Sequence, residues 1–210
     1  MKVAIFSESP ADDAAIRVLI NGVLSRETDE IGLPFLQGRG WPSVKANHPA
    51  VLKYLHYQTE TEALVIVVDL DDTLIHEKKH EQANGFEPKC RLCFLRESTR
   101  KVQSQLRPRG GRAPMKIAVG LAMPAIEAWY LNGIDPQATE AMCIQGGAQK
   151  RAVEYKNKLK EMVYKTSRPS LSHETQRAVE EAQRLAQNLL LLEQNFPLGF
   201  GSLVRDLQSW

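Results

Sequence analysis

The feature that most constrains this chain is a short apolar run followed by a pair of aspartates. Residues 63–68 are all aliphatic, and Asp69, Leu70 and Asp71 come directly after them. An apolar run of this length predicts a strand buried on both faces, which is typical of the centre of a parallel sheet. Open α/β sheets bind ligands at the carboxyl ends of their strands, where both aspartates fall. Residues two apart in a strand point to the same side, so the two carboxylates are expected to share one small volume.

Two neighbouring carboxylates favour a bound cation, because like charges in one volume disfavour the ionised form of both groups. Carboxylate oxygens are hard ligands that suit Mg²⁺ or Mn²⁺. An aspartate at the end of a buried strand also has no packing reason to be there. We therefore expect Asp69 and Asp71 to bind a divalent metal, with Asp72 as a further candidate ligand.

A glutamate follows the first predicted strand in a similar position. Residues 2–6 predict a strand, and residues 11–24 predict a helix because apolar side chains recur at helical spacing. Pro10 suits the first turn of that helix, where its missing N–H is not needed. Glu8 therefore lies on a strand-to-helix loop, the same kind of position as Asp69. If the two strands are neighbours, Glu8 faces the aspartates across one crevice.

Three further acids have a simpler interpretation as residues in the first turn of a helix. Asp12 and Asp13 lie at the start of the first predicted helix, where the helix dipole favours negative charge. Glu127 follows Pro124 by three residues at the start of a later predicted helix. A role for any of them in binding a metal stays open at this point.

The order of these segments resembles a known domain. An apolar strand followed by a glutamate, a helix and a later strand ending in Asp-x-Asp is similar to the Toprim domain of topoisomerases, bacterial primases and OLD-type nucleases. Residues 125–131 and 197–203 also resemble segments of small stand-alone Toprim-like proteins, so the resemblance covers most of the chain. The sequence departs from the family where Ser9 and Pro10 follow Glu8 in place of the usual glycine.

The resemblance implies a metal-dependent nuclease that hydrolyses phosphodiesters of DNA or RNA with Mg²⁺ or Mn²⁺. It implies that Glu8, Asp69 and Asp71 are catalytic and bind the metal, and that Glu127 binds or supports it. It also suggests a cytoplasmic role in antiviral defence or DNA repair. No Walker A pattern occurs in this sequence, so an ATPase partner would be encoded separately.

Residues 69–75 also resemble the first motif of haloacid-dehalogenase-type phosphatases. There Asp69 would be the nucleophile, Asp71 the acid/base and Thr73 a stabilising group. That family completes its Mg²⁺ site with acidic residues after a later strand, whereas residues 120–124 contain none. A phosphatase stays an alternative. A third is a non-catalytic Toprim-fold subunit that binds nucleic acid or a partner.

Two histidines and two cysteines have spacings found among zinc ligands. They are His76 and His80, separated by three residues, and Cys90 and Cys93, separated by two. A structural Zn²⁺ would fix the weakly patterned segment after the Asp-x-Asp strand. The alternative is two exposed histidines in a charged helix and two buried thiols. An odd number of cysteines, three in all, favours a reducing cytoplasm over a disulfide framework.

The net charge is only +2, but positive charge is concentrated between Lys89 and Lys116, where Glu97 is the only acid. This composition favours phosphate binding, although a run of charge is also typical of a solvated surface. The loop at residues 107–112 contains two glycines that permit close approach to a nucleic-acid backbone, and we expect it to flank the acidic crevice. The candidate contacts are Arg91, Arg96, Arg100, Lys101, Arg107, Arg109 and Arg112.

Alternating strand and helix signals predict an α/β protein with a Toprim-like parallel sheet flanked by helices. We expect a catalytic core at 1–135, with a basic and possibly zinc-binding insertion at 74–114, and a helical extension at 136–210. No run is long and apolar enough to span a membrane, and a homo-oligomer is open. Further predicted strands are 31–36 and 115–121, and further predicted helices are 47–57 with Asn47 as its cap, 148–164 and 172–194.

Overall fold

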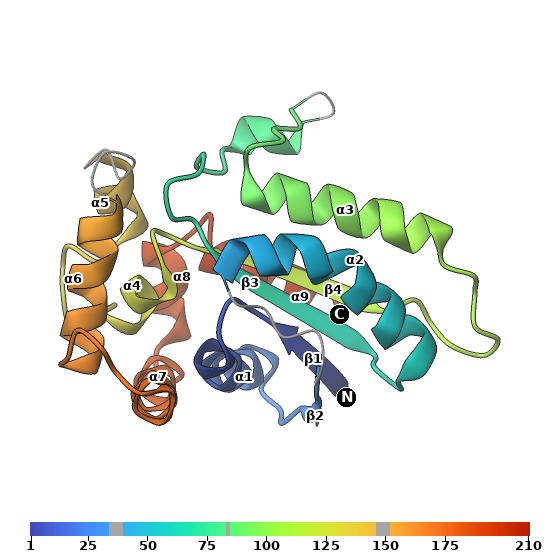
Figure 1. The fold of residues 1–210 in the computed structure, drawn as a ribbon, viewed down its shortest axis with the longest axis horizontal. Coiled ribbons are helices and arrows are strands. Elements are labelled where there is room, and N and C mark those ends of the chain that lie inside the picture. The colour runs from blue at the N-terminus through green and yellow to red at the C-terminus, as the bar shows by residue number, and fades with distance from the viewer. Residues whose placement is uncertain (34–39, 83–84, 146–151) are drawn as a thin grey trace.

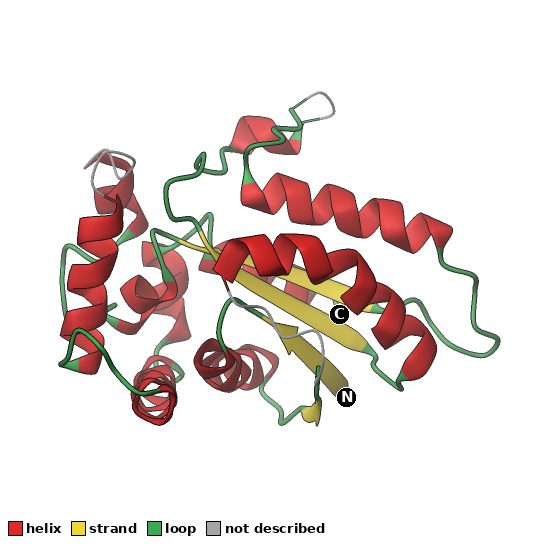
Figure 2. Cartoon of the chain, viewed as in Figure 1, coloured by secondary structure: helices red, strands yellow, loops and turns green. Residues whose placement is uncertain are grey.

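The computed structural model describes residues 1–33, 40–82, 85–145 and 152–210. Its centre is a sheet of parallel strands in the order β2-β1-β3-β4 (Figure 1). The strands are β1 (Lys2–Phe6), β2 (Asp29–Ile31), β3 (Ala63–Asp69) and β4 (Lys116–Ala122). Helices flank the sheet, so the predicted α/β class is confirmed (Figure 2).

The helices differ widely in length. They are α1 (Pro10–Leu24), α2 (Gly40–Gln58), the short 3₁₀ helix η1 (Lys78–Glu81), α3 (Arg91–Gln105), α4 (Ile126–Tyr130), α5 (Glu140–Gln145), α6 (Ala152–Tyr164), α7 (Leu171–Leu185), α8 (Leu189–Asn195) and α9 (Phe200–Gln208).

Strand β3 is buried at every position, as its sequence predicts. Val65 and Val67 point into a core shared with α1, α7 and α9, whereas Leu64 and Ile66 point into a second core shared with α2 and α3. The period of two in a strand separates these two sets of side chains. The molecule is therefore a sheet between two helical layers (Figure 1).

Several predicted element boundaries are wrong. Helix α2 begins at Gly40, and Asn47 lies inside it, where its side chain donates to Ser43 rather than capping the helix. Strand β2 covers only Asp29–Ile31, so it is much shorter than the strand predicted at 31–36 and shares only Ile31 with it. Residues 34–36 lie outside the described residues. Of the helix predicted at 148–164, residues 148–151 also lie outside them.

The single helix predicted at 172–194 is two helices, α7 and α8. Helix α7 ends at Leu185, and Asn188 begins the next helix by accepting a hydrogen bond from the Leu191 amide at 3.2 Å. Asparagine is a strong N-cap residue, because its side-chain oxygen satisfies an amide that the helix leaves free. The polar residue inside the leucine-rich stretch therefore marks a break in the helix.

Of the helices after residue 135, α9 packs on the sheet itself, and α7 packs on the helical layer that covers one face of the sheet. Helix α7 lies against α1, and α9 lies against β4. Phe200 and Leu203 of α9 belong to the same buried cluster as Val65 of β3. The predicted boundary at residue 135 stays a prediction. No helix within the described ranges is both long and apolar enough to cross a membrane.

Candidate metal-binding active site

Three carboxylates meet at the carboxyl ends of neighbouring strands. Glu8 follows β1, Asp69 ends β3, and Glu127 lies in α4, which follows β4. All three line one cavity of about 200 Å³, together with Asp12 and Glu174. The expectation that Glu8 faces the Asp-x-Asp strand is met, since Oε1 of Glu8 accepts a hydrogen bond from the Asp69 amide at 3.0 Å.

Arg91 is an internal counter-ion of this cluster. Its guanidinium donates to Oε1 of Glu8 at 3.1 Å and to the Asp69 carbonyl at 2.6 Å, and it pairs with Oδ2 of Asp71 at 2.9 Å. The residue is only 5% exposed, and its guanidinium lies over the Trp41 ring at 4.8 Å. The sequence predicted Arg91 as a contact for a nucleic-acid backbone, and that role stays a prediction. The structure adds that Arg91 is buried among the carboxylates of the acidic site.

Lys156 of α6 bridges the two aspartates. Its ammonium lies 2.6 Å from Oδ2 of Asp69 and 2.6 Å from Oδ1 of Asp71. Burial alone would raise the pKa of Asp71, but the hydrogen bond and charge of Lys156, with Arg91, lower that pKa below its usual value. Burial would lower the pKa of Lys156, but the two aspartates raise it. Sequence reasoning did not select Lys156 for this site.

Glu127 is a buried carboxylate of the cluster with one oxygen left without a partner among the described residues. It is 3% exposed, and its Oε1 lies 3.4 Å from the Tyr164 hydroxyl and 3.6 Å from the Lys160 ammonium. Its Oε2 is buried and has no hydrogen-bond partner among the residues that the structure describes. Burial and then the charge of Asp69 raise the pKa of Glu127 to about 7. A buried carboxylate oxygen without a donor favours a cation beside it.

The rest of the cluster shows the same excess of negative charge. Burial, followed by the charge of Asp69, raises the pKa of Glu8 to about 7. The same two causes, with Glu127, raise the pKa of Asp12 well above its usual value. Asp12 and Asp13 are first-turn acids of α1 as predicted, but Asp12 also lines the cavity.

Asp71 and Asp72 diverge after the end of β3. Asp71 has a φ of 49°, a left-handed conformation that aspartate tolerates better than most residues. Its carboxylate stays with the cluster. Asp72 is exposed, and within the described ranges no hydrogen bond or ion pair joins it to the cluster. Its role as a metal ligand stays a prediction.

One face of α6 contributes to the site, and a sequence signal for it exists. Lys156, Lys160 and Tyr164 are four residues apart in turn, so they lie on the same side of the helix. All three line the cavity. The spacing was visible in the sequence, but nothing local indicates that this face of α6 packs over the ends of β1 and β3.

The four predicted zinc ligands also come together. The ligand atoms of His76, His80, Cys90 and Cys93 all lie within 4.8 Å of one another, so this His/Cys cluster could hold a metal ion. The alternative of two exposed histidines in a charged helix is wrong. His76 is buried after β3, and half-buried His80 lies in the short helix η1.

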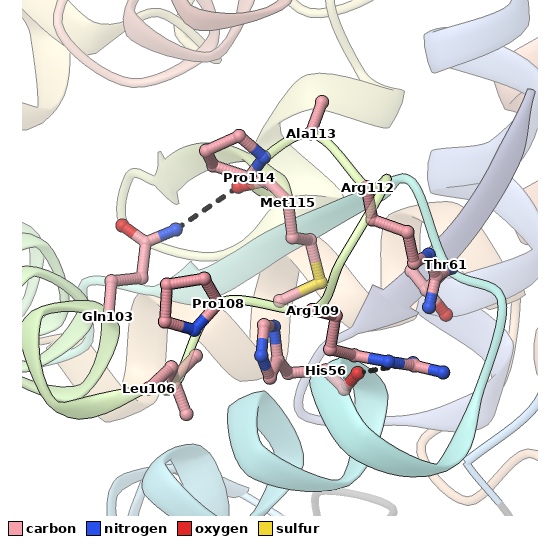
Figure 3. Close-up of a pocket in the computed structure, with 10 residues that line it drawn as sticks. All are labelled: His56, Thr61, Gln103, Leu106, Pro108, Arg109, Arg112, Ala113, Pro114 and Met115. Carbon is pink, nitrogen blue, oxygen red and sulfur yellow. Dashed lines mark hydrogen bonds between the residues drawn. The ribbon is translucent and has the colours of Figure 1, made fainter.

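The basic loop at 107–112 lies away from the acidic cluster. It joins α3 to the amino end of β4, whereas the carboxylates lie at the carboxyl ends of the strands (Figure 1). There Arg109 donates to the His56 carbonyl at 2.6 Å, and both line a separate pocket of about 290 Å³ (Figure 3). The expectation that this loop flanks the acidic crevice is wrong, because a loop that precedes a parallel strand lies at the amino edge of the sheet.

The other predicted nucleic-acid contacts already have protein partners. Arg112 of the basic loop donates to the Thr59 carbonyl at 2.8 Å. Arg96 donates to the Ser202 hydroxyl at 2.8 Å and pairs with Asp206 at 3.4 Å. Arg100 and Lys101 are exposed on α3, where both pair with Glu97. For Arg107, the contacts within the described ranges are made by its backbone: its amide donates to the Tyr57 hydroxyl at 3.0 Å, and its carbonyl lies 2.9 Å from Nε2 of His56.

Comparison of the chain with protein-family models, with curated proteins and with solved structures finds no match. A function for this chain therefore has to be inferred from the geometry of the acidic cluster.

Proposed function

We propose that this chain is a Toprim-like, metal-dependent nuclease that hydrolyses phosphodiester bonds in DNA or RNA. The observation that carries the proposal is the buried Oε2 of Glu127, which has no hydrogen-bond partner in the described part of the chain and belongs to a cavity that Glu8 and Asp69 also line. These three residues, with Asp71, form the candidate ligand set for Mg²⁺ or Mn²⁺.

The donors present suit such an ion. Carboxylate oxygens from the ends of three neighbouring strands are hard ligands. Four carboxylates, Glu8, Asp69, Asp71 and Glu127, are contacted by three cations, Arg91, Lys156 and Lys160. A buried polar atom without a partner costs about 1–3 kcal/mol. A divalent cation bound here supplies Lewis-acid stabilisation of phosphate charge and activation of a water molecule.

The protein's own cations suit the substrate. Lys156 and Lys160 line the cavity from α6, and Arg91 lies beside it with two donors on the cluster. Their charges can hold phosphate oxygens against the carboxylates. A polymer is proposed to present a backbone phosphate at the mouth of this cavity, where the cations lie.

Glu8 is the candidate proton acceptor near the scissile phosphate. Its carboxylate is held by the Asp69 amide and by Arg91, so its position is fixed relative to Asp69. Positioned carboxylates of this kind can accept a proton from an attacking water. The role in antiviral defence or DNA repair and the separately encoded ATPase partner belong to this proposal through the Toprim resemblance alone, and the cytoplasmic setting also through the odd number of cysteines.

The test is cleavage of plasmid DNA and labelled RNA with Mg²⁺ or Mn²⁺. Glu127→Gln and Asp69→Asn are expected to lower the rate at least about 100-fold, because each removes charge that the metal needs. Glu154→Gln is the matched control, since Glu154 is an exposed carboxylate on α6. Cleavage at the wild-type rate by folded Glu127→Gln and Asp69→Asn would contradict the proposal.

A phosphatase is the second candidate, because Asp69 lines the cavity and shares Lys156 with Asp71. Thr73, the predicted stabilising group, donates its hydroxyl to the Leu70 carbonyl at 2.7 Å and so closes a turn. A chromogenic phosphomonoester in the same assay separates the two enzymes. Turnover of that compound with no cleavage of nucleic acid would favour the phosphatase, and activity on neither would favour the binding subunit.

For the His/Cys cluster we propose a bound Zn²⁺. Its role is structural rather than catalytic, because none of the four residues is among those that line the acidic cavity.

A further inference from the structure

The His/Cys cluster joins the exit from β3 to the start of α3. His76 lies five residues after Asp71, and His80 lies in η1. Cys90 is the N-cap residue of α3, and Cys93 is in its first turn. The cluster thus joins the segment that follows β3 to the first turn of α3.

The distances are close to those of a four-coordinate metal site. Nδ1 of His76 lies 3.4 Å from Sγ of Cys90 and 3.5 Å from Sγ of Cys93. In a tetrahedral zinc site with ordinary bond lengths, ligand atoms are separated by roughly 3.3–3.8 Å. These two separations already fall in that range. All ligand atoms of the set lie within 4.8 Å of one another, so the remaining ligand atoms need to move only slightly closer together to reach tetrahedral geometry.

A carboxylate supports the histidine at the centre of the cluster. Nε2 of His76, on the side away from the sulfurs, lies 3.4 Å from Oε1 of Glu81. Ligating histidines commonly use their second nitrogen in this way, and the contact fixes the ring orientation.

We propose that His76, His80, Cys90 and Cys93 bind one Zn²⁺ ion and that this ion positions Arg91 in the acidic site. Arg91 directly follows one cysteine ligand and precedes the other by two residues. Fixing both sulfurs therefore fixes the first turn of α3, from which the guanidinium reaches Glu8, the Asp69 carbonyl and Asp71. In this proposal the zinc ligands are positioning residues that act on the acidic site through Arg91, and zinc binding itself does not depend on the nuclease activity.

A redox-active dithiol is the competing interpretation, because Cys-x-x-Cys at the start of a helix is also a thiol–disulfide motif. A dithiol does not need a histidine nitrogen near both sulfurs, nor a second histidine within reach. The structure provides both. The ligand set therefore favours zinc.

Metal content tests the site without any use of catalysis. The purified chain is expected to contain about one zinc per molecule by elemental mass spectrometry, and Cys93→Ser is expected to lose it. Cobalt substitution should give the absorption bands of tetrahedral thiolate coordination. Cys143→Ser is the matched control, because Cys143 is a buried free cysteine outside the cluster, and it should keep the metal. A chain with no zinc and a Cys90–Cys93 disulfide in its intact mass would overturn the site.

Trp41 reports on the position of Arg91. The Arg91 guanidinium lies 4.8 Å from the Trp41 ring, so its movement away from the ring should change the fluorescence emission of Trp41. That emission is obtained as the difference between the spectra of the wild type and of Trp41→Phe. Removal of zinc by a chelator is expected to shift this difference spectrum in the wild type and to leave it unchanged in Arg91→Ala. An unchanged wild-type spectrum after complete loss of zinc, or an equal shift in Arg91→Ala, would overturn the positioning role.

Discussion

Lys156 is the residue whose position most affects how the acidic site would bind a metal. Its ammonium touches one oxygen of each aspartate, while the other oxygen of Asp69 accepts a hydrogen bond from the Ile126 amide at 2.9 Å. Both oxygens of Asp69 thus have partners within the protein. A divalent ion that bridges the aspartates has to share them with Lys156 or displace its side chain.

Removal of this competing charge should strengthen metal binding. Lys156→Met is expected to bind Mn²⁺ roughly tenfold more tightly, which corresponds to about 1.4 kcal/mol, because two aspartates lose their internal cation. Isothermal titration at pH 7.5 measures the change. Lys53→Met, at an exposed position of α2, is the control. Weaker binding by Lys156→Met than by wild type would mean that the aspartates do not form the metal site.

Glu127 gives the expected pH dependence of stability. Its pKa is about 7 in the folded chain and ordinarily 4.5, so folding disfavours its ionised form. The stability associated with the protonated group is fully present below pH 4.5 and is lost as the pH rises through 7. With metal removed by a chelator at pH 8, Glu127→Gln should therefore have a free energy of unfolding about 2 kcal/mol higher than that of the wild type. Urea unfolding at pH 5 and pH 8 measures the difference, which should shrink at pH 5. An equal difference at both values would contradict the raised pKa.

At the scale of elements, the loop before α9 explains one segment of the Toprim resemblance. Gly199 lies so close to β4 that a Cβ there would be 2.1 Å from the Leu121 carbonyl oxygen. Its amide donates to Oε1 of Glu140 at 2.8 Å, and Phe200 packs edge-on against Trp129 with ring centroids 5.3 Å apart. The Gly-Phe pair thus docks α9 on the sheet and on the segment that carries Glu127.

Any side chain at position 199 should disturb this docking. Gly199→Ala is expected to cost about 3 kcal/mol or more in free energy of unfolding, because the atom in the way belongs to the backbone of β4 and cannot rotate aside. Gly110→Ala, where an added Cβ meets nothing within 4 Å, is the control and should change stability little. Thermal melting compares the two, and similar melting temperatures would contradict the close approach.

Elements also show which parts of the site the sequence could predict. Glu8 and Asp69 were predictable, because a residue after a parallel strand must lie at the carboxyl edge of the sheet. By the same rule the 107–112 loop, which precedes β4, has to lie at the amino edge of the sheet, so the expectation that it flanks the acidic crevice was wrong. Arg91 and Lys156 were not predictable as internal cations, because each reaches the aspartates through long-range packing of a helix that looks like a charged surface.

At the scale of the whole molecule, the α/β class and a parallel sheet flanked by helices followed from sequence, while the identity of the helices that form each layer did not. The buried run in β3 demands cover on both faces, and this requirement holds whichever helices supply it. That α7 would cover α1 and α9 would cover β4 depends on packing between segments far apart in the chain. Local periodicity carries no information about such pairings.

Strand β4 lies at an edge of the sheet, and its outer rim is partly closed. The Val119 amide donates to Oδ2 of Asp206 in α9 at 3.0 Å, and Arg96 pairs with the same carboxylate. An exposed row of free amides is a template on which another chain can add a strand, and a buried or occupied donor removes part of that template. Self-association of this molecule by continuation of the sheet past β4 is therefore disfavoured.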